Sequence, residues 1–517
     1  MKNADEEISA LLMVLASSRM RRNRFLFVSR LPPELLARIF SFSAAIDPPS
    51  SSALGWITVT HVCSHWRQVA LDHSTLWANV SLEIGSRWSD EMIQRAKLAP
   101  LIITPPRFFT QAVSEIAVRI LHSHLGRTTE LRLTSRKVFL PPMETFTASA
   151  PLLEEVCISS IHEYVRLPND LFGHNAPRLR SACFRGCIIP WSSPLLRNLT
   201  HLDIALSSQG SNMDTAPNLP SHEEFFDLLA NMCRLESLSI EEYFPRSLPE
   251  ATASSRMRYP VIKLPHLSVL GLTGQWSDCA PVLRSIEVPA TSRISLDCLD
   301  LDSNIFDSVL LPIVERHSGK TGEALPMRTL RIGIVSGLGY SFQIYLRYSN
   351  VVASLETLHA ILQALHIQEL SLLVLGFWTR APKDFLAIFE PLKSAQRLEH
   401  IMYEDDACSL FPSTLAHTSV SESGPDNAHD QAIPFPRLRF IELWTNALGD
   451  GSALRYNGAA GRVGPVDKLV ETLERREALG VPLERLEIHI DPSRTDPGYL
   501  DQLKAATQNT VIEVLDQ

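Results

Sequence analysis

The 517-residue chain has few cysteines, no long apolar run and no strong excess of either charge. Its eight cysteines lack paired spacing, which argues against a disulfide framework and favours a reducing compartment. A formal net charge of −9 is small for this length and speaks against non-specific nucleic-acid binding, which needs a basic surface. The apolar patch at 10–16 follows acidic residues and is too short to span a membrane. We therefore expect a cytoplasmic or nuclear protein with no nucleic-acid or membrane partner.

Sequence signatures of catalysis are also missing. The glycines at 449–464 do not lead into the Gly-Lys-Ser/Thr of a phosphate-binding loop, and no serine lies in a Gly-x-Ser-x-Gly turn. His61 and His65 lie one helical turn apart with Cys63 between them, but no glutamate follows His61 as in zinc proteases. We expect this pair to be surface histidines, and we expect no enzyme activity, no cofactor and no metal.

The length of the chain exceeds what one ordinary hydrophobic core accommodates, and 45% hydrophobic with 20% charged residues is typical of folded protein. We divide it into a leader helix (1–27), a small helical module (28–82) and a long array of strands and helices (83–517). The leader is expected to be amphipathic and to pack on its own chain or on a partner, because four apolar residues share one helical face. These are Ile8, Leu11, Leu12 and Leu15.

The helical module begins with the stretch from Leu31 to Phe40. Prolines at the first helical positions cost nothing, because the amides there have no partner within the helix. Behind them Leu35, Leu36, Ile39 and Phe40 fall on one helical stripe. A second apolar series at helical spacing closes with a Leu-Trp pair: Trp56, Val59, Cys63, Trp66, Ala70, Leu76 and Trp77. Three short amphipathic pieces form a thin core, and we expect a partner to complete it.

This order of residues, Leu-Pro-x-Glu-Leu-Leu-x-x-Ile-Phe, Val-Cys-x-x-Trp-Arg and Leu-Trp, resembles the F-box, and most closely the fungal F-box-like group. The resemblance covers about residues 5–82. It implies that the segment docks the adaptor of an SCF-type (cullin-RING) ubiquitin ligase and, through the adaptor, cullin. The residues implied in adaptor binding are Leu31, Pro32, Glu34, Leu35, Ile39, Phe40, Cys63, Trp66, Leu76 and Trp77. Two features depart from the family: Ser43 replaces an apolar residue, and the loop at 45–54 is long.

A triplet of apolar positions recurs from about residue 128, with two residues between its first members and one between its last. Copies are Leu153/Val156/Ile158, Leu179/Ala182/Phe184, Leu199/Leu202/Ile204, Leu235/Leu238/Ile240, Leu267/Leu270/Leu272, Met327/Leu330/Ile332, Ile367/Leu370/Leu372, Leu398/Ile401/Tyr403, Leu438/Ile441/Leu443 and Leu483/Leu486/Ile488. The alternation within each copy predicts a short strand with one buried face. Weaker copies are Leu131/Leu133 and Ile294/Leu296.

Helical stripes lie between these strands. A capping box opens one at Ser221, and others run over 355–365, 385–392 and 466–479, the last followed by Gly480. A repeated strand, turn and helix is typical of a leucine-rich-repeat solenoid, although the spacing varies from 20 to 45 residues. The alternative is an ordinary α/β domain with leucine-rich strands. We expect surface loops at 411–433 and 449–465.

Residues beside the buried pair of each strand are expected to face outward on a shared surface. They include Cys183, Arg185, Asp203, Glu241, Arg331, Met402, Glu404, Glu442, Trp444, Glu487 and His489. Because tryptophan and arginine carry a large share of interface energy, we expect target binding by Arg185, Asp203, Glu241, Arg331, Glu404, Glu442 and Trp444. The alternative for Trp444 is that it packs under the following loop.

The expected fold class is mixed α and α/β, with an N-terminal three-helix F-box-like module followed by an irregular leucine-rich-repeat solenoid. The function implied by the resemblance is that of a substrate receptor, which docks the adaptor and binds an unidentified target protein for ubiquitination. The alternative is a leucine-rich-repeat scaffold for protein interactions without ligase function.

Overall fold

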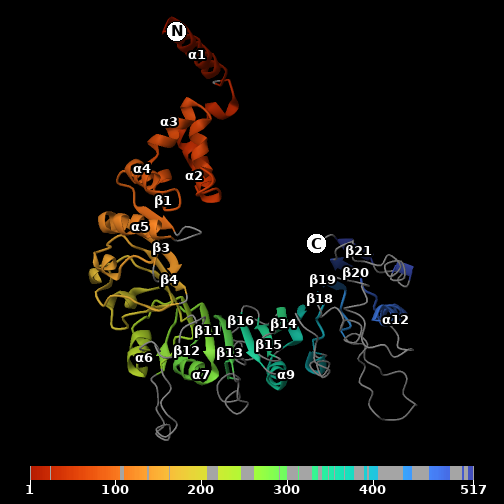
Figure 1. The fold of residues 1–517 in the computed structure, drawn as a ribbon. Helices are drawn as coiled ribbons and strands as arrows, with labels where there is room; N and C mark the ends of the chain where they lie inside the picture. The colour runs from red at the N-terminus through yellow and green to blue at the C-terminus, as the bar shows by residue number, and fades with distance from the viewer. Residues whose placement is uncertain are drawn as a thin grey trace, which may run out of the picture. The chain divides into compact units, whose positions relative to one another are not determined.

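The computed structural model describes residues 2–23, 25–104, 110–136, 139–161, 163–206, 219–245, 261–289, 291–299, 312–313, 329–335, 341–346, 349–353, 355–365, 367–377, 389–392, 395–405, 435–444, 465–489, 504–505 and 511–515. The chain forms two compact units, an N-terminal unit (Met1–Arg246) and a C-terminal unit (Ser247–Gln517) (Figure 1). The N-terminal unit holds the predicted leader, the helical module and the first strands of the array. Within the described ranges, no helix is both long and apolar enough to cross a bilayer. The predicted loops at 411–433 and 449–465 lie outside these ranges, except for Pro465, which is the first residue of a helix.

The N-terminal unit mixes helices and strands. Its α-helices are α1 (Lys2–Asn23), α2 (Pro33–Ile46), α3 (Ser64–Asp72), α4 (Ser86–Ala96), α5 (Gln111–His124) and α6 (His222–Ala230). Its 3-10 helices are η1 (Phe27–Arg30), η2 (Gly55–His61), η3 (Ser74–Trp77), η4 (Leu125–Arg127), η6 (Met143–Thr147), η7 (Leu171–His174) and η8 (Pro194–Asn198). Its strands are β1 (Asn79–Ser81), β2 (Leu101–Thr104), β3 (Thr128–Arg136), β4 (Glu155–Ile161), β5 (Val165–Arg166), β6 (Ser181–Arg185), β7 (Cys187–Ile188), β8 (His201–Ala205) and β9 (Ser237–Glu241).

Parallel pairing joins the longer strands of this unit in chain order, β1-β2-β3-β4-β6-β8-β9. The short strands β5 and β7 form a separate parallel pair. From β3 to β9 the last two residues of each predicted triplet align in two columns. The columns are Leu131, Val156, Ala182, Leu202, Leu238 and Leu133, Ile158, Phe184, Ile204, Ile240, and all of these side chains are buried. The triplets therefore predicted both the strands and their buried face.

The C-terminal unit contains α7 (Trp276–Ser285), α9 (Leu355–Ala364), η11 (Ile367–Glu369), α10 (Phe389–Leu392) and α12 (Pro465–Ala478). Its strands are β10 (Ile262–Lys263), β11 (Val269–Gln275), β12 (Ile286–Glu287), β13 (Arg293–Leu299), β14 (Thr329–Val335), β15 (Ser341–Leu346), β16 (Ser349–Ala353), β17 (Leu372–Phe377), β18 (His400–Asp405), β19 (Phe440–Trp444), β20 (Arg485–His489) and β21 (Val511–Leu515).

Most of these strands also pair in parallel, but not all in chain order. β11 pairs with β13 and β13 with β16, and a second parallel series runs β14-β17-β18-β19-β20-β21. β15 joins the two series because it pairs antiparallel with both β14 and β16. The strands β15 and β16 were not predicted, and they interrupt the expected uniform order. The described strands form no closed sheet.

The predicted triplet at Ile367 was wrong in register. The structure pairs Leu373 with Ile401 and Leu375 with Tyr403, so the strand begins three residues later than predicted. The sequence offers leucine at 370, 372, 373 and 375, and alternation alone does not choose between two overlapping patterns. Leu370 is still buried, in the position that precedes the strand.

Capping signals in the sequence correctly predicted where one helix begins and where another ends. Ser221 accepts a hydrogen bond from the Glu224 amide at 3.2 Å, and the Glu224 carboxylate accepts one from the Ser221 amide at 2.9 Å. This capping box begins α6, in which Phe225 and Phe226 are buried. Gly480 follows α12 with φ +76°, a left-handed conformation that favours glycine.

Candidate functional site

Helix α2 carries apolar side chains on two opposite faces. Leu36, Ala37 and Phe40 are at most 2% exposed. On the other face Leu35 is 48% exposed and Ile39 is 47% exposed. Phe42 and Ile46 continue this exposed stripe at 61% and 83%. The spacing of 4, 3 and 4 residues keeps these four side chains, the α2 stripe, on one side of the helix.

The inner face of α2 packs on an aromatic core. The ring of Phe40 lies 5.2 Å from that of Trp66, and Trp56 meets Trp77 edge-on at 4.9 Å. The indole nitrogen of Trp77 donates a hydrogen bond to the Ala70 carbonyl at 2.8 Å, so this fully buried ring has its polar atom satisfied. The core therefore holds α2 with its outer stripe facing solvent.

The prolines lie at the start of α2, as predicted. Pro32 is the N-cap and Pro33 the first helical residue, and the Pro32 carbonyl accepts from the amides of Leu35 and Leu36 at 3.0 and 3.1 Å. Glu34 is exposed in the first turn, where the helix dipole favours a carboxylate. Leu31 is half-buried, and Pro32 is exposed.

The long loop after α2 is closed by specific contacts. The Trp56 amide donates to the Asp47 carbonyl at 2.8 Å, and the Ser81 hydroxyl donates to the Pro49 carbonyl at 3.1 Å. Gly55 has φ +53°, and a side chain there would lie 2.5 Å from the Asp47 carbonyl oxygen. The loop therefore returns the chain to the core despite its length.

The structure separates the predicted adaptor-binding residues into two groups. Leu35, Ile39, Pro32 and Glu34 are exposed, whereas Leu31, Cys63 and Trp66 are partly buried. Phe40, Leu76 and Trp77 are at most 3% exposed, so they form the core of the module rather than its surface. The single stripe predicted for α2 was therefore wrong, because Leu35 and Ile39 face outward while Leu36 and Phe40 face inward.

The second predicted helix is divided in two. η2 ends at His61 and α3 begins at Ser64, with Cys63 as its N-cap. The Cys63 sulfur accepts a hydrogen bond from the Trp66 amide at 3.5 Å.

In the leader, Ile8, Leu11, Leu12 and Leu15 are 46–65% exposed. The predicted helix is present there, but its apolar face is not buried on the described part of the chain.

These features can now be compared with known proteins. Residues 28–83 match the F-box-like family model. No curated protein matches the chain. The match coincides with the predicted module and covers α2, η2, α3 and η3. The α2 stripe is thus an exposed apolar surface within an F-box-like segment.

A second group of predicted residues meets on the N-terminal sheet. Arg185 on β6 lies 2.7 Å from the Asp203 carboxylate on β8 and 3.8 Å from the Glu241 carboxylate on β9. The hydrogen bond to Asp203 raises the pKa of Arg185, so the guanidinium stays charged. All three side chains are 32–47% exposed. These three predicted target-binding residues therefore form one solvent-facing charged cluster.

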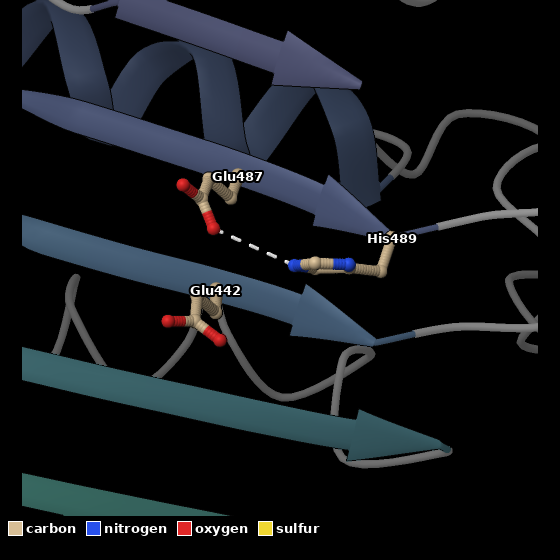
Figure 2. Close-up of side chains that lie close together, drawn as sticks. All are labelled: Glu442, Glu487 and His489. Carbon is tan, nitrogen blue, oxygen red and sulfur yellow. Dashed lines mark ion pairs between the residues drawn. The ribbon is translucent and has the colours of Figure 1, made fainter. Parts of the chain in front are cut away.

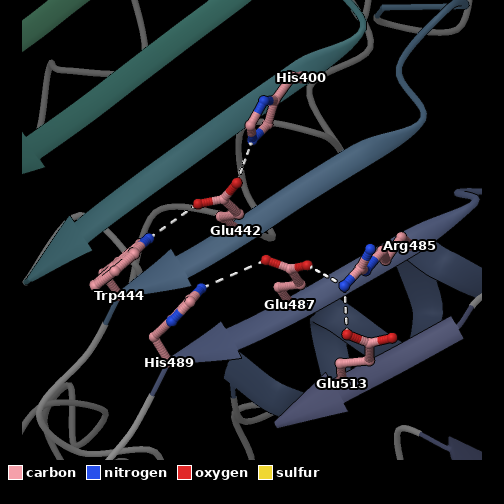
Figure 3. Close-up of polar contacts among 7 residues, drawn as sticks. All are labelled: His400, Glu442, Trp444, Arg485, Glu487, His489 and Glu513. Carbon is pink, nitrogen blue, oxygen red and sulfur yellow. Dashed lines mark hydrogen bonds and ion pairs between the residues drawn. The ribbon is translucent and has the colours of Figure 1, made fainter. Parts of the chain in front are cut away.

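A third group lies on the C-terminal sheet (Figure 3). Glu442 accepts from the Trp444 indole at 3.1 Å and lies 3.1 Å from the His400 ring nitrogen. The Trp444 ring stacks on His489 at 3.8 Å and remains 37% exposed. Burial lowers the pKa of His400, against the opposite effect of Glu442 and Glu487. Both predicted residues on β19 belong to this polar group.

Neighbouring residues extend the group to β20 and β21. Glu487 lies 2.5 Å from Arg485 and 3.5 Å from His489, and Arg485 also forms an ion pair with Glu513. Residues 442, 487 and 513 are aligned across three adjacent strands. Three of the seven members, His400, Arg485 and Glu513, were not predicted. These three could be found only with the strand register, which places each of them beside residues of a neighbouring strand.

The other two predicted target-binding residues lie on β18 and β14. Glu404 is the second-last residue of β18, opposite Trp444 in register, and is half-buried. Arg331 lies on β14 opposite Val374, and only its backbone is described. Their roles stay predictions.

Proposed function

We propose that this chain is a substrate receptor of an SCF-type ubiquitin ligase. The observation that carries the proposal is an F-box-like segment whose first helix presents an exposed apolar stripe. Four large apolar side chains at 47–83% exposure along one helix face form a surface that a partner helix can cover. In the proposal that partner is the adaptor, which links the chain to cullin.

The remainder of the chain, 83–517, acts in this proposal as an irregular leucine-rich-repeat array that binds a target protein. Support comes from the parallel pairing of successive strands and from the two polar clusters around Arg185 and Trp444. The chain performs no chemistry of its own. It raises the effective concentration of target lysines near a ubiquitin-conjugating enzyme.

The test replaces the two best-placed residues of the stripe with aspartate, Leu35→Asp and Ile39→Asp together. Because both side chains already face solvent, the module keeps its fold, while a charge within the buried contact costs about 2 kcal/mol or more. We expect adaptor binding to weaken at least about 30-fold. Leu98→Asp is the matched control, since Leu98 is 93% exposed elsewhere in the same unit.

Adaptor binding is measured on purified full-length proteins, and circular dichroism checks that each variant is folded. Equal adaptor affinity of the double variant and wild type would reject the α2 stripe as the docking site. Failure of the wild-type chain to bind adaptor and cullin at all favours the alternative, a protein-interaction scaffold without ligase function.

A further inference from the structure

Three side chains on the C-terminal sheet converge in the way that metal ligands do. Glu442 on β19 and Glu487 and His489 on β20 place one carboxylate or imidazole atom each within 4.8 Å of one another. Figure 2 shows the three side chains on the same face of the two strands. In the part of the chain that the structure describes, no other group of three such residues lies this close.

The register of the sheet produces this convergence. Glu442 and Glu487 are direct neighbours on parallel strands, and His489 lies two residues beyond Glu487, so it projects from the same face. Trp444 is the neighbour of His489, and the two rings stack at an interplanar angle of 8°. The stack fixes the imidazole plane, which places its Nε2 atom 3.5 Å from the Glu487 carboxylate.

Burial and charge favour a cation at this point. The side chains of Glu442, Glu487 and His489 are only 14%, 12% and 13% exposed. Two carboxylates held together with little water repel each other. Arg485 is shared between Glu487 and Glu513, so the row of three aligned carboxylates has one guanidinium among its partners. Three carboxylates and one guanidinium give these four residues an excess of negative charge.

Each carboxylate also has a polar partner outside the point of convergence. Trp444 and His400 contact the two oxygens of Glu442, each at 3.1 Å. Arg485 contacts one oxygen of Glu487, while the other faces His489. Outer partners of this kind orient the ligands of protein-bound metals.

We propose that Glu442, Glu487 and His489 bind one Zn²⁺ ion, with water in the fourth position. Zinc accepts imidazole nitrogen together with carboxylate oxygen and is satisfied by four ligands. Magnesium and calcium prefer ligands that are all oxygen, whereas one of the three ligands here is an imidazole nitrogen. The ion links β19 to β20 at the ends of the strands. This site is independent of adaptor docking on α2.

Isothermal titration of the metal-free full-length protein with ZnCl₂ tests the proposal. We expect one binding event that weakens at least tenfold in His489→Gln and in Glu442→Gln. Glu484→Gln is the matched control, because Glu484 is exposed just before β20 and pairs with Arg439 at 3.2 Å, outside the group around the three ligands. The control variant keeps the wild-type affinity.

Hydrogen exchange of β19 and β20 with and without Zn²⁺ localises the binding, since histidines elsewhere also bind zinc weakly. Slower exchange in these strands, lost in His489→Gln, supports the site. The proposal is overturned if Zn²⁺ does not slow exchange in the wild-type protein, or if His489→Gln binds zinc as the wild type does. In either case the three residues belong only to an ion-pair network. Circular dichroism checks that each variant is folded. If His489→Gln is unfolded, Glu442→Gln serves as the test variant in its place.

Discussion

Leu35 and Leu36 are adjacent in sequence and have opposite environments. Leu36 is completely buried against the aromatic core, whereas Leu35 is 48% exposed. A helix turns by about 100° per residue, so adjacent side chains face different directions. In the proposed function, Leu36 therefore contributes to the stability of the module and Leu35 to its contact with a partner.

We predict that Leu36→Ala lowers the free energy of unfolding by about 2–5 kcal/mol, because it leaves a cavity on the buried face of α2. Leu35→Ala should change it by less than about 0.5 kcal/mol, since that side chain is 48% exposed. Chemical unfolding of both variants, followed by tryptophan fluorescence, measures the difference. Similar losses in the two variants would contradict the assignment of the faces.

Cysteine reactivity provides a second test at this scale. Cys233 is exposed, whereas Cys187 is buried, and burial raises the pKa of the Cys187 thiol to about 12. Only the thiolate reacts, and at pH 8 about one Cys187 in 10⁴ is ionised. We predict that iodoacetamide at pH 8 modifies Cys233 and spares Cys187 until denaturant is added. Peptide mass mapping after timed labelling measures both, and equal rates in native protein would refute the prediction.

Among the elements, the strands were the most predictable. Apolar triplets located them because one buried face imposes alternation, and the buried columns follow from the parallel register. The prediction failed at β17, where four leucines fit two registers, and at β15 and β16, which carry no triplet. For α2, periodicity indicated a helix but not which of two apolar faces lies inside. That choice depends on Trp56 and Trp77, which are distant in sequence.

The capping box of α6 yields a pH-dependent prediction. Hydrogen bonds from the Ser221 amide and hydroxyl lower the pKa of Glu224 from its ordinary value of 4.5. The stabilisation is therefore complete above pH 4.5 and is lost as the pH falls through the lowered value in the folded protein. Ser221→Ala should cost about 1 kcal/mol at pH 7.

Urea unfolding of Ser221→Ala at pH 7 and at about pH 3 measures this cost, which should shrink in acid as Glu224 is protonated. Ser51→Ala is the control, because Ser51 is an exposed serine outside any helix. A Ser221→Ala deficit that is unchanged or larger in acid would show that the carboxylate contributes nothing to the cap.

At the scale of the whole molecule, the sequence predicts polar surfaces better than it predicts which distant residues meet as possible metal ligands. Outward positions of the strands predicted Arg185 with Asp203 and Glu442 with Trp444, since the side chains of a strand alternate. The prediction of no metal rested on the histidines at 61 and 65, and the spacing of 47 residues between Glu442 and His489 matches no zinc motif. Only the pairing of β19 with β20 brings them together.

The division into two units leads to a prediction about fragments. Residues 1–246 contain their own buried core and should unfold cooperatively on heating as an isolated fragment. Residues 1–82 alone should be much less stable, because they lose α4, whose Arg95 guanidinium lies 4.3 Å from the Trp77 ring. Differential scanning calorimetry compares the two fragments, and equal melting temperatures would contradict a shared core.

Chain-order pairing in the N-terminal unit also bears on synthesis at the ribosome. Every strand from β2 to β9 in that sheet pairs with one translated shortly before it. Each strand can therefore pair with a strand that has already been synthesised, and no strand stays unpaired until a distant one is made. The F-box-like helices precede these strands in the chain, so they are synthesised before the sheet is complete.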